Sequence, residues 1–293
     1  MNAAEYLAWA RPLLGSGYAE RIFLNLPGEL STAGGAGHFL ESSAASDAGL
    51  SRLKLALILE DSPAALALDA VRRDAPGKVQ AATSLLSTIK GEYDRRPAAA
   101  VLDCLKRWAL RGSLMLSVDF ERERGAFGKL SFYGYLPGPE RLGELLAAFG
   151  RGGLEPALRP LAGATLAFFG VDLAPGAPAA LKLYNKTAYP DRALEGPAAA
   201  AAQSLLEAGP LRDVTRLTRV GSDAGPKAYL GFARGVPLET LSRLPCMGGS
   251  GGWLGEAARA APGQRARFVG FDHGAVEVYF DRSGFGPEEE RRP

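Results

Sequence analysis

A strand–strand–helix unit recurs along this chain, and it constrains the fold more strongly than any other feature of the sequence. Three consecutive units each contain two strand-like segments, a short turn between them and a helix-like segment after them, and a fourth strand pair follows. The pairs are SLMLSVDFER with GKLSFYGYL, ATLAFFGVDL with AALKLYNKT, RDVTRLTRVG with KAYLGFARG, and RARFVGF with AVEVYFDR. Because loops this short join antiparallel neighbours, the repeat predicts one antiparallel sheet with helices against one side.

The residues before the repeat predict further strands and helices. Two strands are expected, at Arg21–Leu26 and in the segment SRLKLALILED, and the Gly-, Ser- and Ala-rich segment Pro27–Gly49 between them is predicted to be a loop. Helices are expected over residues 2–14, 62–73, 78–91 and 97–111. The run GGSGG at Gly248–Gly252 is also expected to be a loop. We predict a single α+β domain over residues 1–293.

The alternation of polar and apolar residues along the strands predicts which residues lie on each face of the sheet. In the segment LKLYNK, Lys182, Tyr184 and Lys186 alternate with apolar or amide residues, and the other hairpins repeat this pattern. The aliphatic face would pack against the helices, which leaves the other face polar and aromatic. Closure of the sheet into a barrel would remove its edges and make this second face the wall of an internal chamber.

Composition and charge narrow the class of protein. Apolar residues make up 47% of the 293 residues and charged residues 23%, as in an ordinary globular chain. A formal net charge of +2 argues against a nucleic-acid-binding protein, although it allows a local cationic pocket. No apolar run of about 18 residues occurs, and the N-terminus lacks the features of a signal peptide, so we expect a cytoplasmic protein without a membrane span.

Cationic and tyrosine residues recur at matching positions of separate strands, and this set is the candidate site. It contains Arg52, Lys54, Lys129, Tyr133, Lys182, Tyr184, Lys227, Tyr229 and Tyr279. Several cations suit a diphosphate, because they offset the charge that grows as a carbon–oxygen bond breaks. Tyrosine faces would stabilise an allyl cation and exclude water. No DDxxD motif is present, so the charge is expected to come chiefly from side-chain cations, and no metal ligand can be named.

Several short motifs accompany this pattern. Leu40-Glu41-Ser42-Ser43 precedes the first cationic strand, which ends in Glu60-Asp61. Later matches are Ser117-Val118-Asp119 with Lys129-Leu130-Ser131, and Gly170-Val171-Asp172. Together with the repeat, these residues resemble the ABBA prenyltransferases, and among them the peptide-modifying prenyltransferases of cyanobactin pathways. The resemblance spans about residues 38–285 and implies a ten-stranded antiparallel barrel of ββα units with helices outside.

The resemblance also implies roles for individual residues. Glu41 matches the position of a general base beside the acceptor. Arg52 or Lys54 matches the first diphosphate-binding cation, and Lys129, Lys182 and Lys227 match later ones. Tyr133, Tyr184, Tyr229 and Tyr279 match the aromatic shield of the cation. That family is associated with Mg²⁺, but no carboxylate cluster in this sequence identifies ligands for the ion.

The expected activity is transfer of a C5 or C10 prenyl group from an allylic diphosphate to an electron-rich acceptor. The first hypothesis for the acceptor is a side chain of a ribosomal, cyclic peptide, and the second is a free aromatic small molecule. A third hypothesis, from another class, is a barrel that binds a hydrophobic ligand without chemistry. The third would follow if the Lys and Tyr faces pointed at the helices.

Overall fold

The computed structural model describes residues 36–45, 49–59, 83, 94–108, 114–121, 126–136, 138–162, 166–189, 194, 196–222, 227–248, 250–260, 263, 265–272 and 275–281. Its strands are β1 (Ala36–Ala45), β2 (Gly49–Leu59), β3 (Leu114–Glu121), β4 (Ala126–Gly134), β5 (Leu166–Leu173), β6 (Ala180–Ala188), β7 (Leu211–Arg219), β8 (Lys227–Pro237), β9 (Arg265–Asp272) and β10 (Ala275–Asp281). Its α-helices are α6 (Arg95–Arg107), α7 (Leu142–Ala148), α8 (Glu155–Leu158), α9 (Gly196–Ala208), α10 (Leu238–Leu241) and α11 (Ser250–Ala260). The 3-10 helices are Pro139–Arg141, Gly152–Leu154, Arg159–Ala162 and Pro245–Met247.

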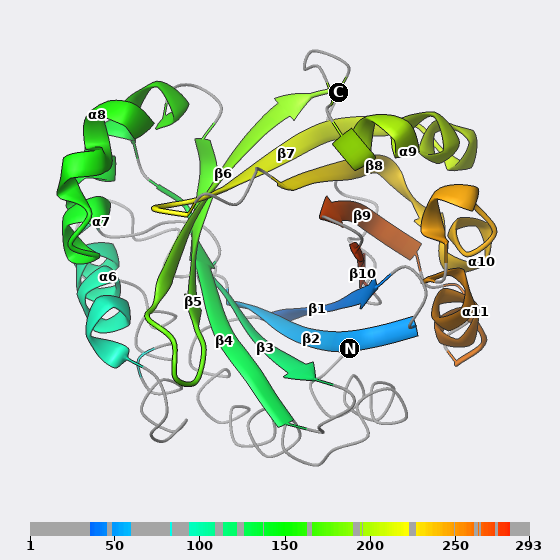
Figure 1. The fold of residues 1–293 in the computed structure, drawn as a ribbon, viewed down its shortest axis with the longest axis horizontal. Coiled ribbons are helices and arrows are strands. Elements are labelled where there is room, and N and C mark those ends of the chain that lie inside the picture. The colour runs from blue at the N-terminus through cyan, green and yellow to red at the C-terminus, as the bar shows by residue number, and fades with distance from the viewer. Residues whose placement is uncertain are drawn as a thin grey trace.

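The strands form one antiparallel sheet that closes into a barrel (Figure 1). Each strand pairs with its neighbours in the chain, and β1 also pairs with β10 to complete the ring. The closing pair aligns Glu41 with Tyr279 and Ser43 with Glu277. The predicted antiparallel sheet of consecutive hairpins is therefore confirmed, and closure leaves no unpaired edge in the ring.

Strand β1 corrects the prediction of a loop over Pro27–Gly49. Its backbone pairs on one side with β2 and on the other with β10, so its polar groups are satisfied by tertiary pairing. The Gly-, Ser- and Ala-rich composition of the segment gave no sign of this, because pairing on both sides can override a weak local strand preference. The strand expected at Arg21–Leu26 lies outside the described residues.

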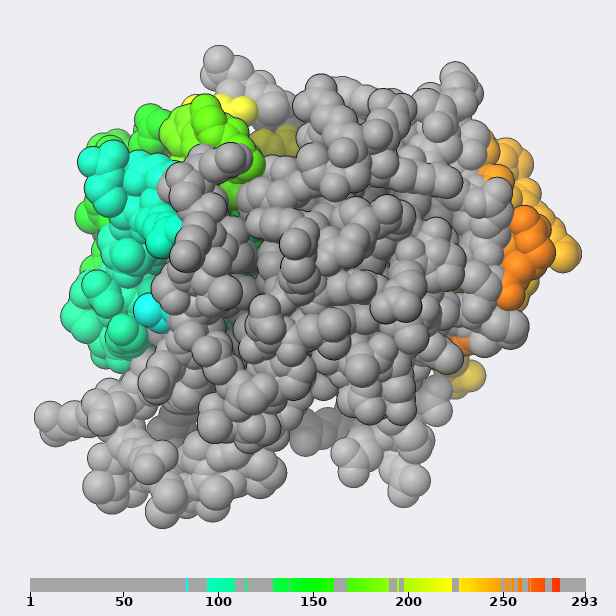
Figure 2. Space-filling model, turned by 90° about the horizontal axis from the view of Figure 1, so that it is seen from below, coloured from blue at the N-terminus to red at the C-terminus, as the bar shows by residue number. Residues whose placement is uncertain are grey.

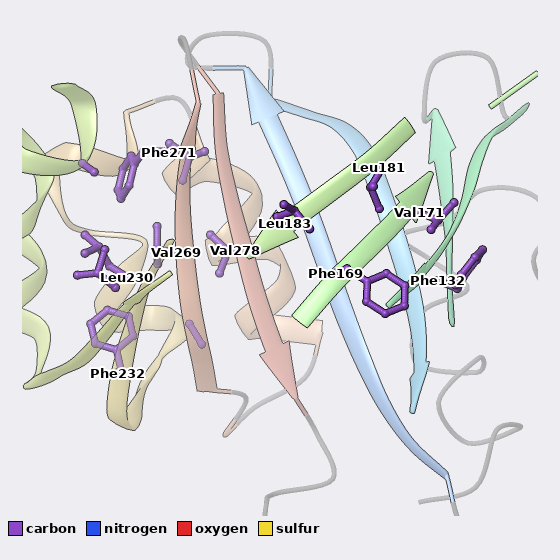
Figure 3. Close-up of a cluster of buried hydrophobic side chains, with 14 of the residues drawn as sticks. Phe132, Phe169, Val171, Leu181, Leu183, Leu230, Phe232, Val269, Phe271 and Val278 are labelled. Carbon is purple, nitrogen blue, oxygen red and sulfur yellow. The ribbon is translucent and has the colours of Figure 1, made fainter. Parts of the chain in front are cut away.

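The helices lie outside the barrel and cover the apolar face of the sheet. Helix α6 contacts β5, α9 and α10 contact β8 and β9, and α11 contacts β2. Figure 2 shows α6 to α8 and α10 to α11 on opposite flanks of the molecule. The core between the helices and strands includes Phe132, Phe169, Leu183 and Leu230, each almost fully buried (Figure 3). The predicted arrangement, with aliphatic residues facing the helices, is confirmed.

Two helices test other predictions from the sequence. Helix α6 overlaps the helix expected over residues 97–111 but begins two residues earlier, where Asp94 caps its N-terminus by accepting a hydrogen bond from the backbone N–H of Arg96. The expected loop at Gly248–Gly252 is wrong in its second half, because α11 begins at Ser250. No helix in the described parts of the chain is long and apolar enough to span a membrane.

The core makes a direct prediction about stability. Replacing Leu183 by Ala removes a fully buried side chain between the sheet and its helices, so the free energy of unfolding should fall by about 2–5 kcal/mol. Urea unfolding followed by far-UV circular dichroism measures the change. Leu206→Ala is the matched control, because Leu206 on α9 is 37% exposed and its truncation should cost far less. Equal losses for both variants would contradict this assignment of the core.

Candidate functional site

Lysine and tyrosine side chains occupy the inner face of the barrel. Tyr133, Tyr184 and Tyr229 form a buried cluster with Leu217, separate from the core under the helices. Along β6, Leu181 and Leu183 belong to the outer core, whereas Lys182 and Tyr184 alternate with them. The predicted orientation of the Lys and Tyr residues is therefore confirmed for β4, β6 and β8. The hypothesis of a barrel that binds a ligand without chemistry required the Lys and Tyr residues to face the helices. On these three strands they face the other way.

Asp172 on β5 brings two of the predicted cations together. Its Oδ1 lies 2.5 Å from the Lys182 Nζ and its Oδ2 lies 3.1 Å from the Lys129 Nζ. Ser131 donates its hydroxyl hydrogen to Oδ1 at 2.7 Å. Strand pairing explains the cluster, because Asp172 lies opposite Ser131 of β4, and Lys182 lies opposite Gly170, two residues before Asp172. One carboxylate is therefore shared by two lysines, and Asp119 of β3 lies opposite Lys129 in the strand register.

Glu277 on β10 forms the second cluster. Its Oε2 lies 2.5 Å from the Lys227 Nζ and accepts hydrogen bonds from the hydroxyls of Tyr229 and Tyr279 at 3.3 and 3.1 Å. Both charged side chains are buried, at 3% exposure for Lys227 and 7% for Glu277. The carboxylate therefore compensates the lysine charge and also orients two tyrosine rings.

A series of aromatic rings connects the two clusters. The Lys182 Nζ lies 5.0 Å from the centroid of the Tyr133 ring, and the Lys227 Nζ lies 5.0 Å from that of Tyr229. The centroids of Tyr133 and Tyr184 are 5.9 Å apart, and those of Tyr184 and Tyr229 are 6.4 Å apart. Phe168 stacks on Tyr184 at 4.3 Å. A ring face attracts a cation, so this wall can stabilise positive charge on carbon as well as on lysine.

Two glycines make room for these rings. A Cβ on Gly170 would lie 2.7 Å from the Tyr133 ring, and a Cβ on Gly270 would lie 2.5 Å from the Tyr229 ring. Each glycine is directly opposite the tyrosine on the neighbouring strand. The rings can therefore lie flat over the adjacent strand because that strand has no side chain at this position.

The backbone register fixes the positions of Glu41, Arg52 and Lys54. Glu41 on β1 lies opposite Tyr279 on one side and Lys54 on the other. Arg52 lies opposite Ser43 and Glu121, and Lys54 is also opposite Asp119. Because directly opposite residues belong to the same face of a sheet, all three positions fall on the face that carries Tyr279. The register does not choose between Arg52 and Lys54 as the first diphosphate-binding cation.

The sequence analysis found the lysines and tyrosines but did not assign their carboxylate partners. Lys129 and Lys182 share Asp172, whereas Lys227 pairs with Glu277, so the three cations are divided between two clusters. The sequence contained a signal for both partners, because the alternation of side chains along β5 and β10 puts Asp172 and Glu277 on the same face of the sheet as the lysines. Register across strands was needed to pair them.

Metal-ligating residues do not gather in the part of the chain that the structure describes, where no group of three or more His, Cys, Asp or Glu side chains could hold an ion. The carboxylates of Asp172 and Glu277 are instead bound to lysine ammonium groups.

No protein-family model and no curated protein sequence matches this chain. Solved structures, however, share its fold. A 5-dimethylallyltryptophan synthase from Streptomyces coelicolor superposes with a TM-score of 0.65 at 15% identity and covers 95% of each chain. The prenyltransferase PriB, in complex with L-tryptophan and dimethylallyl thiolodiphosphate, gives 0.63 at 14% identity over 94% of this chain and 93% of PriB.

A 6-dimethylallyltryptophan synthase from Micromonospora olivasterospora gives a TM-score of 0.55 at 20% identity, over 83% of this chain and 81% of that chain. The predicted resemblance to the ABBA prenyltransferases is thus confirmed at the level of the fold. The narrower likeness to the cyanobactin enzymes stays a prediction from sequence motifs.

The glycine beneath Tyr229 yields a test of the site geometry. Gly270→Ala should push the Tyr229 ring from its position, lower the free energy of unfolding by about 1–3 kcal/mol and change the near-UV circular dichroism of tyrosine. Gly252→Ala is the control, because a Cβ there meets nothing within 4 Å and a helical Gly-to-Ala change should stabilise α11. A Gly270→Ala protein as stable as the wild type, with an unchanged tyrosine spectrum, would contradict the close approach of the Tyr229 ring to the backbone of Gly270.

Proposed function

We propose that this protein is a prenyltransferase that moves a dimethylallyl group from its diphosphate to an electron-rich aromatic acceptor. The observation that carries the proposal is the inner face of the barrel, where buried lysines alternate with tyrosine rings. An inner face with these side chains suits a substrate with an anionic head and an apolar tail that becomes cationic during reaction. The fold likeness adds support, because PriB was solved with L-tryptophan and dimethylallyl thiolodiphosphate.

The first step is heterolytic cleavage of the carbon–oxygen bond of the donor. The electron pair leaves with the diphosphate, whose negative charge Lys129, Lys182 and Lys227 offset, together with Arg52 or Lys54. The allyl cation remains between the rings of Tyr133, Tyr184, Tyr229 and Tyr279, which stabilise it and keep water away. Bound ammonium groups and fixed rings need little reorganisation as the charge develops, so the site favours the transition state.

The second step is capture of the cation by the acceptor. An aromatic carbon or nitrogen forms the new bond, and a proton must then leave the acceptor. The position of Glu41 opposite Tyr279 supports its carboxylate as the base that takes this proton. A geranyl donor would follow the same steps with a longer tail.

The proposal has two versions, which differ in the acceptor substrate. Three of the similar structures are tryptophan prenyltransferases or bind L-tryptophan, which favours a free aromatic amino acid or related small molecule. The sequence motifs shared with the cyanobactin enzymes favour a peptide side chain.

We would incubate the protein with dimethylallyl or geranyl diphosphate and with indole, phenol and cyclic-peptide acceptors, with and without Mg²⁺, and follow products by mass spectrometry. Binding of the donor without any product would instead support the ligand-binding barrel.

Lys182 gives a direct test of the diphosphate step. Lys182→Ala removes a buried cation, so kcat/KM for the donor should fall roughly 100-fold or more. Steady-state kinetics with varied dimethylallyl diphosphate measures the change. Lys106→Ala is the control, because Lys106 is exposed on α6 and should leave the kinetics unchanged. Wild-type kcat/KM in Lys182→Ala would remove this lysine from the site.

Glu41 gives a test of the second step. Glu41→Gln keeps the shape of the side chain but cannot take a proton, so kcat should fall roughly 10²- to 10⁴-fold while the donor still binds. Single-turnover product formation and donor affinity, measured separately, distinguish the two effects. Glu239→Gln, at an exposed position of α10, is the matched control. Near-normal turnover of Glu41→Gln across pH would place the base elsewhere.

A further inference from the structure

The Glu277 carboxylate reaches groups of another strand across the middle strand of three, and the mechanism above gives it no role. Glu277 on β10 lies opposite Gly270 on β9, and Gly270 in turn lies opposite Tyr229 on β8. A Cβ on Gly270 would lie 2.5 Å from the Tyr229 ring and 3.3 Å from the Lys227 Cε. Because the middle strand has no side chain here, groups from β8 and β10 can meet over it. The Glu277 Oε2 accordingly lies 2.5 Å from the Lys227 Nζ and 3.3 Å from the Tyr229 hydroxyl oxygen.

The same oxygen also holds Tyr279, which follows Glu277 by two residues on β10. The Tyr279 hydroxyl donates to Oε2 at 3.1 Å. The rings of Tyr229 and Tyr279 stand nearly perpendicular, at 79°, with their centroids 5.4 Å apart. Phe268 meets the Tyr279 ring at a similar angle, 85°, with the centroids 6.3 Å apart. One carboxylate oxygen therefore fixes the hydroxyl ends of two rings whose faces point in different directions.

The ion pair makes Glu277 a permanent acceptor of hydrogen bonds. The side chain of Glu277 is 7% exposed and that of Lys227 is 3% exposed, and a buried carboxylate remains an anion only beside a counter-charge. Lys227 supplies this charge. An ionised carboxylate accepts hydrogen bonds without donating any, and it binds donors more strongly than a neutral group does. Both tyrosine hydroxyls must therefore point their hydrogens at Glu277, which gives each ring a defined position.

Ring positions matter because the allyl cation has two possible partners. In transfer, a carbon or nitrogen of the acceptor bonds to the cation, and the acceptor then loses a proton. In the competing reaction, the oxygen of a water molecule bonds to the same cation and the water loses a proton, which yields a C5 alcohol and wastes the donor. The diphosphate leaves with its electron pair in both reactions. Rings that cover the cation oppose the second reaction because they exclude water.

We propose that Glu277 is a positioning residue, which holds Tyr229 and Tyr279 by their hydroxyls over the allyl cation and so favours transfer to the acceptor over capture by water. The proposal rests on the proposed function, and Glu277 acts in it through the two rings rather than on a substrate. It gives the buried ion pair a role in deciding what the cation becomes, which is separate from the binding of the diphosphate.

The experiment measures the ratio of prenylated product to C5 alcohol. The protein is incubated with dimethylallyl diphosphate, in water enriched in ¹⁸O, with the acceptor of the panel above that gives most product. Mass spectrometry counts only the alcohol that contains ¹⁸O, because capture of the cation by water puts the label on carbon, whereas cleavage of a phosphorus–oxygen bond does not. A reaction without protein corrects for spontaneous hydrolysis. Partial loss of folded protein lowers both products equally, so the ratio reports ring positions rather than stability.

Two variants of Glu277 separate hydrogen bonding from charge. Glu277→Gln and Glu277→Leu both lack the charge that compensates Lys227, but only glutamine keeps an oxygen that accepts from the tyrosine hydroxyls. The ratio of product to alcohol in Glu277→Leu should therefore be roughly tenfold below that in Glu277→Gln, an effect of the size expected for a lost hydrogen bond. Glu239→Leu, at an exposed position of α10, should keep the wild-type ratio.

A further variant removes the same hydrogen bonds from the side of the rings. If Glu277→Leu does not fold, Tyr229→Phe combined with Tyr279→Phe removes both hydroxyls but keeps both rings and the ion pair. Its ratio should fall roughly tenfold below that of the wild type. Tyr135→Phe is the matched control, because Tyr135 directly follows β4 and is 47% exposed, so its ratio should stay at the wild-type value.

Each outcome decides the proposal. Equal ratios for Glu277→Leu and Glu277→Gln would overturn it, and so would a wild-type ratio in the double phenylalanine variant. Failure of the proposed function has a different signature: the wild type would form no prenylated product with any acceptor of the panel. That result would overturn the proposed function and this inference together, whereas normal transfer by the wild type with unchanged ratios in the variants would overturn the role of Glu277 alone.

Discussion

The candidate site depends on carboxylates that share a sheet face with lysines. An ammonium group buried without a counter-charge is costly, and in most proteins it would lose its proton or move to solvent. Here, Asp172 holds Lys129 and Lys182, and Glu277 holds Lys227, through contacts between paired or nearby strands. The barrel can therefore keep several cations inside before any substrate arrives.

The two carboxylates give the clusters different properties. In the first cluster, Asp172 holds two lysines at once, Lys129 through one oxygen and Lys182 through the other. The Glu277 cluster balances its one lysine, and its carboxylate orients Tyr229 and Tyr279 as well. A series of rings lies between the two clusters, and Gly170 and Gly270 allow the rings to lie close to the sheet. Charge and ring positions therefore come from the same feature, the strict alternation of residues in a closed barrel.

Much of this arrangement could be predicted from the sequence because successive side chains of a strand point alternately to the two faces of the sheet. Lys182 and Tyr184 alternate with Leu181 and Leu183, and the structure puts these pairs on opposite faces of β6. Contacts between strands were harder to predict from the sequence, because the ion pair of Lys227 with Glu277 joins residues that are 50 positions apart. Strand β1 was missed because its pairing with β2 and β10, rather than its local composition, stabilises it.

The central claim is that the inner face of this barrel binds an allylic diphosphate between its lysines and tyrosines. A crystal structure with dimethylallyl thiolodiphosphate, a donor analogue bound in the PriB complex, would test it most directly. We expect the diphosphate oxygens within hydrogen-bonding distance of the Lys182 and Lys227 ammonium groups, and the dimethylallyl tail among the rings of Tyr133, Tyr184 and Tyr229. An analogue that bound only on the outer surface, or left the inner lysines on Asp172 and Glu277 with no contact to phosphate, would contradict the claim.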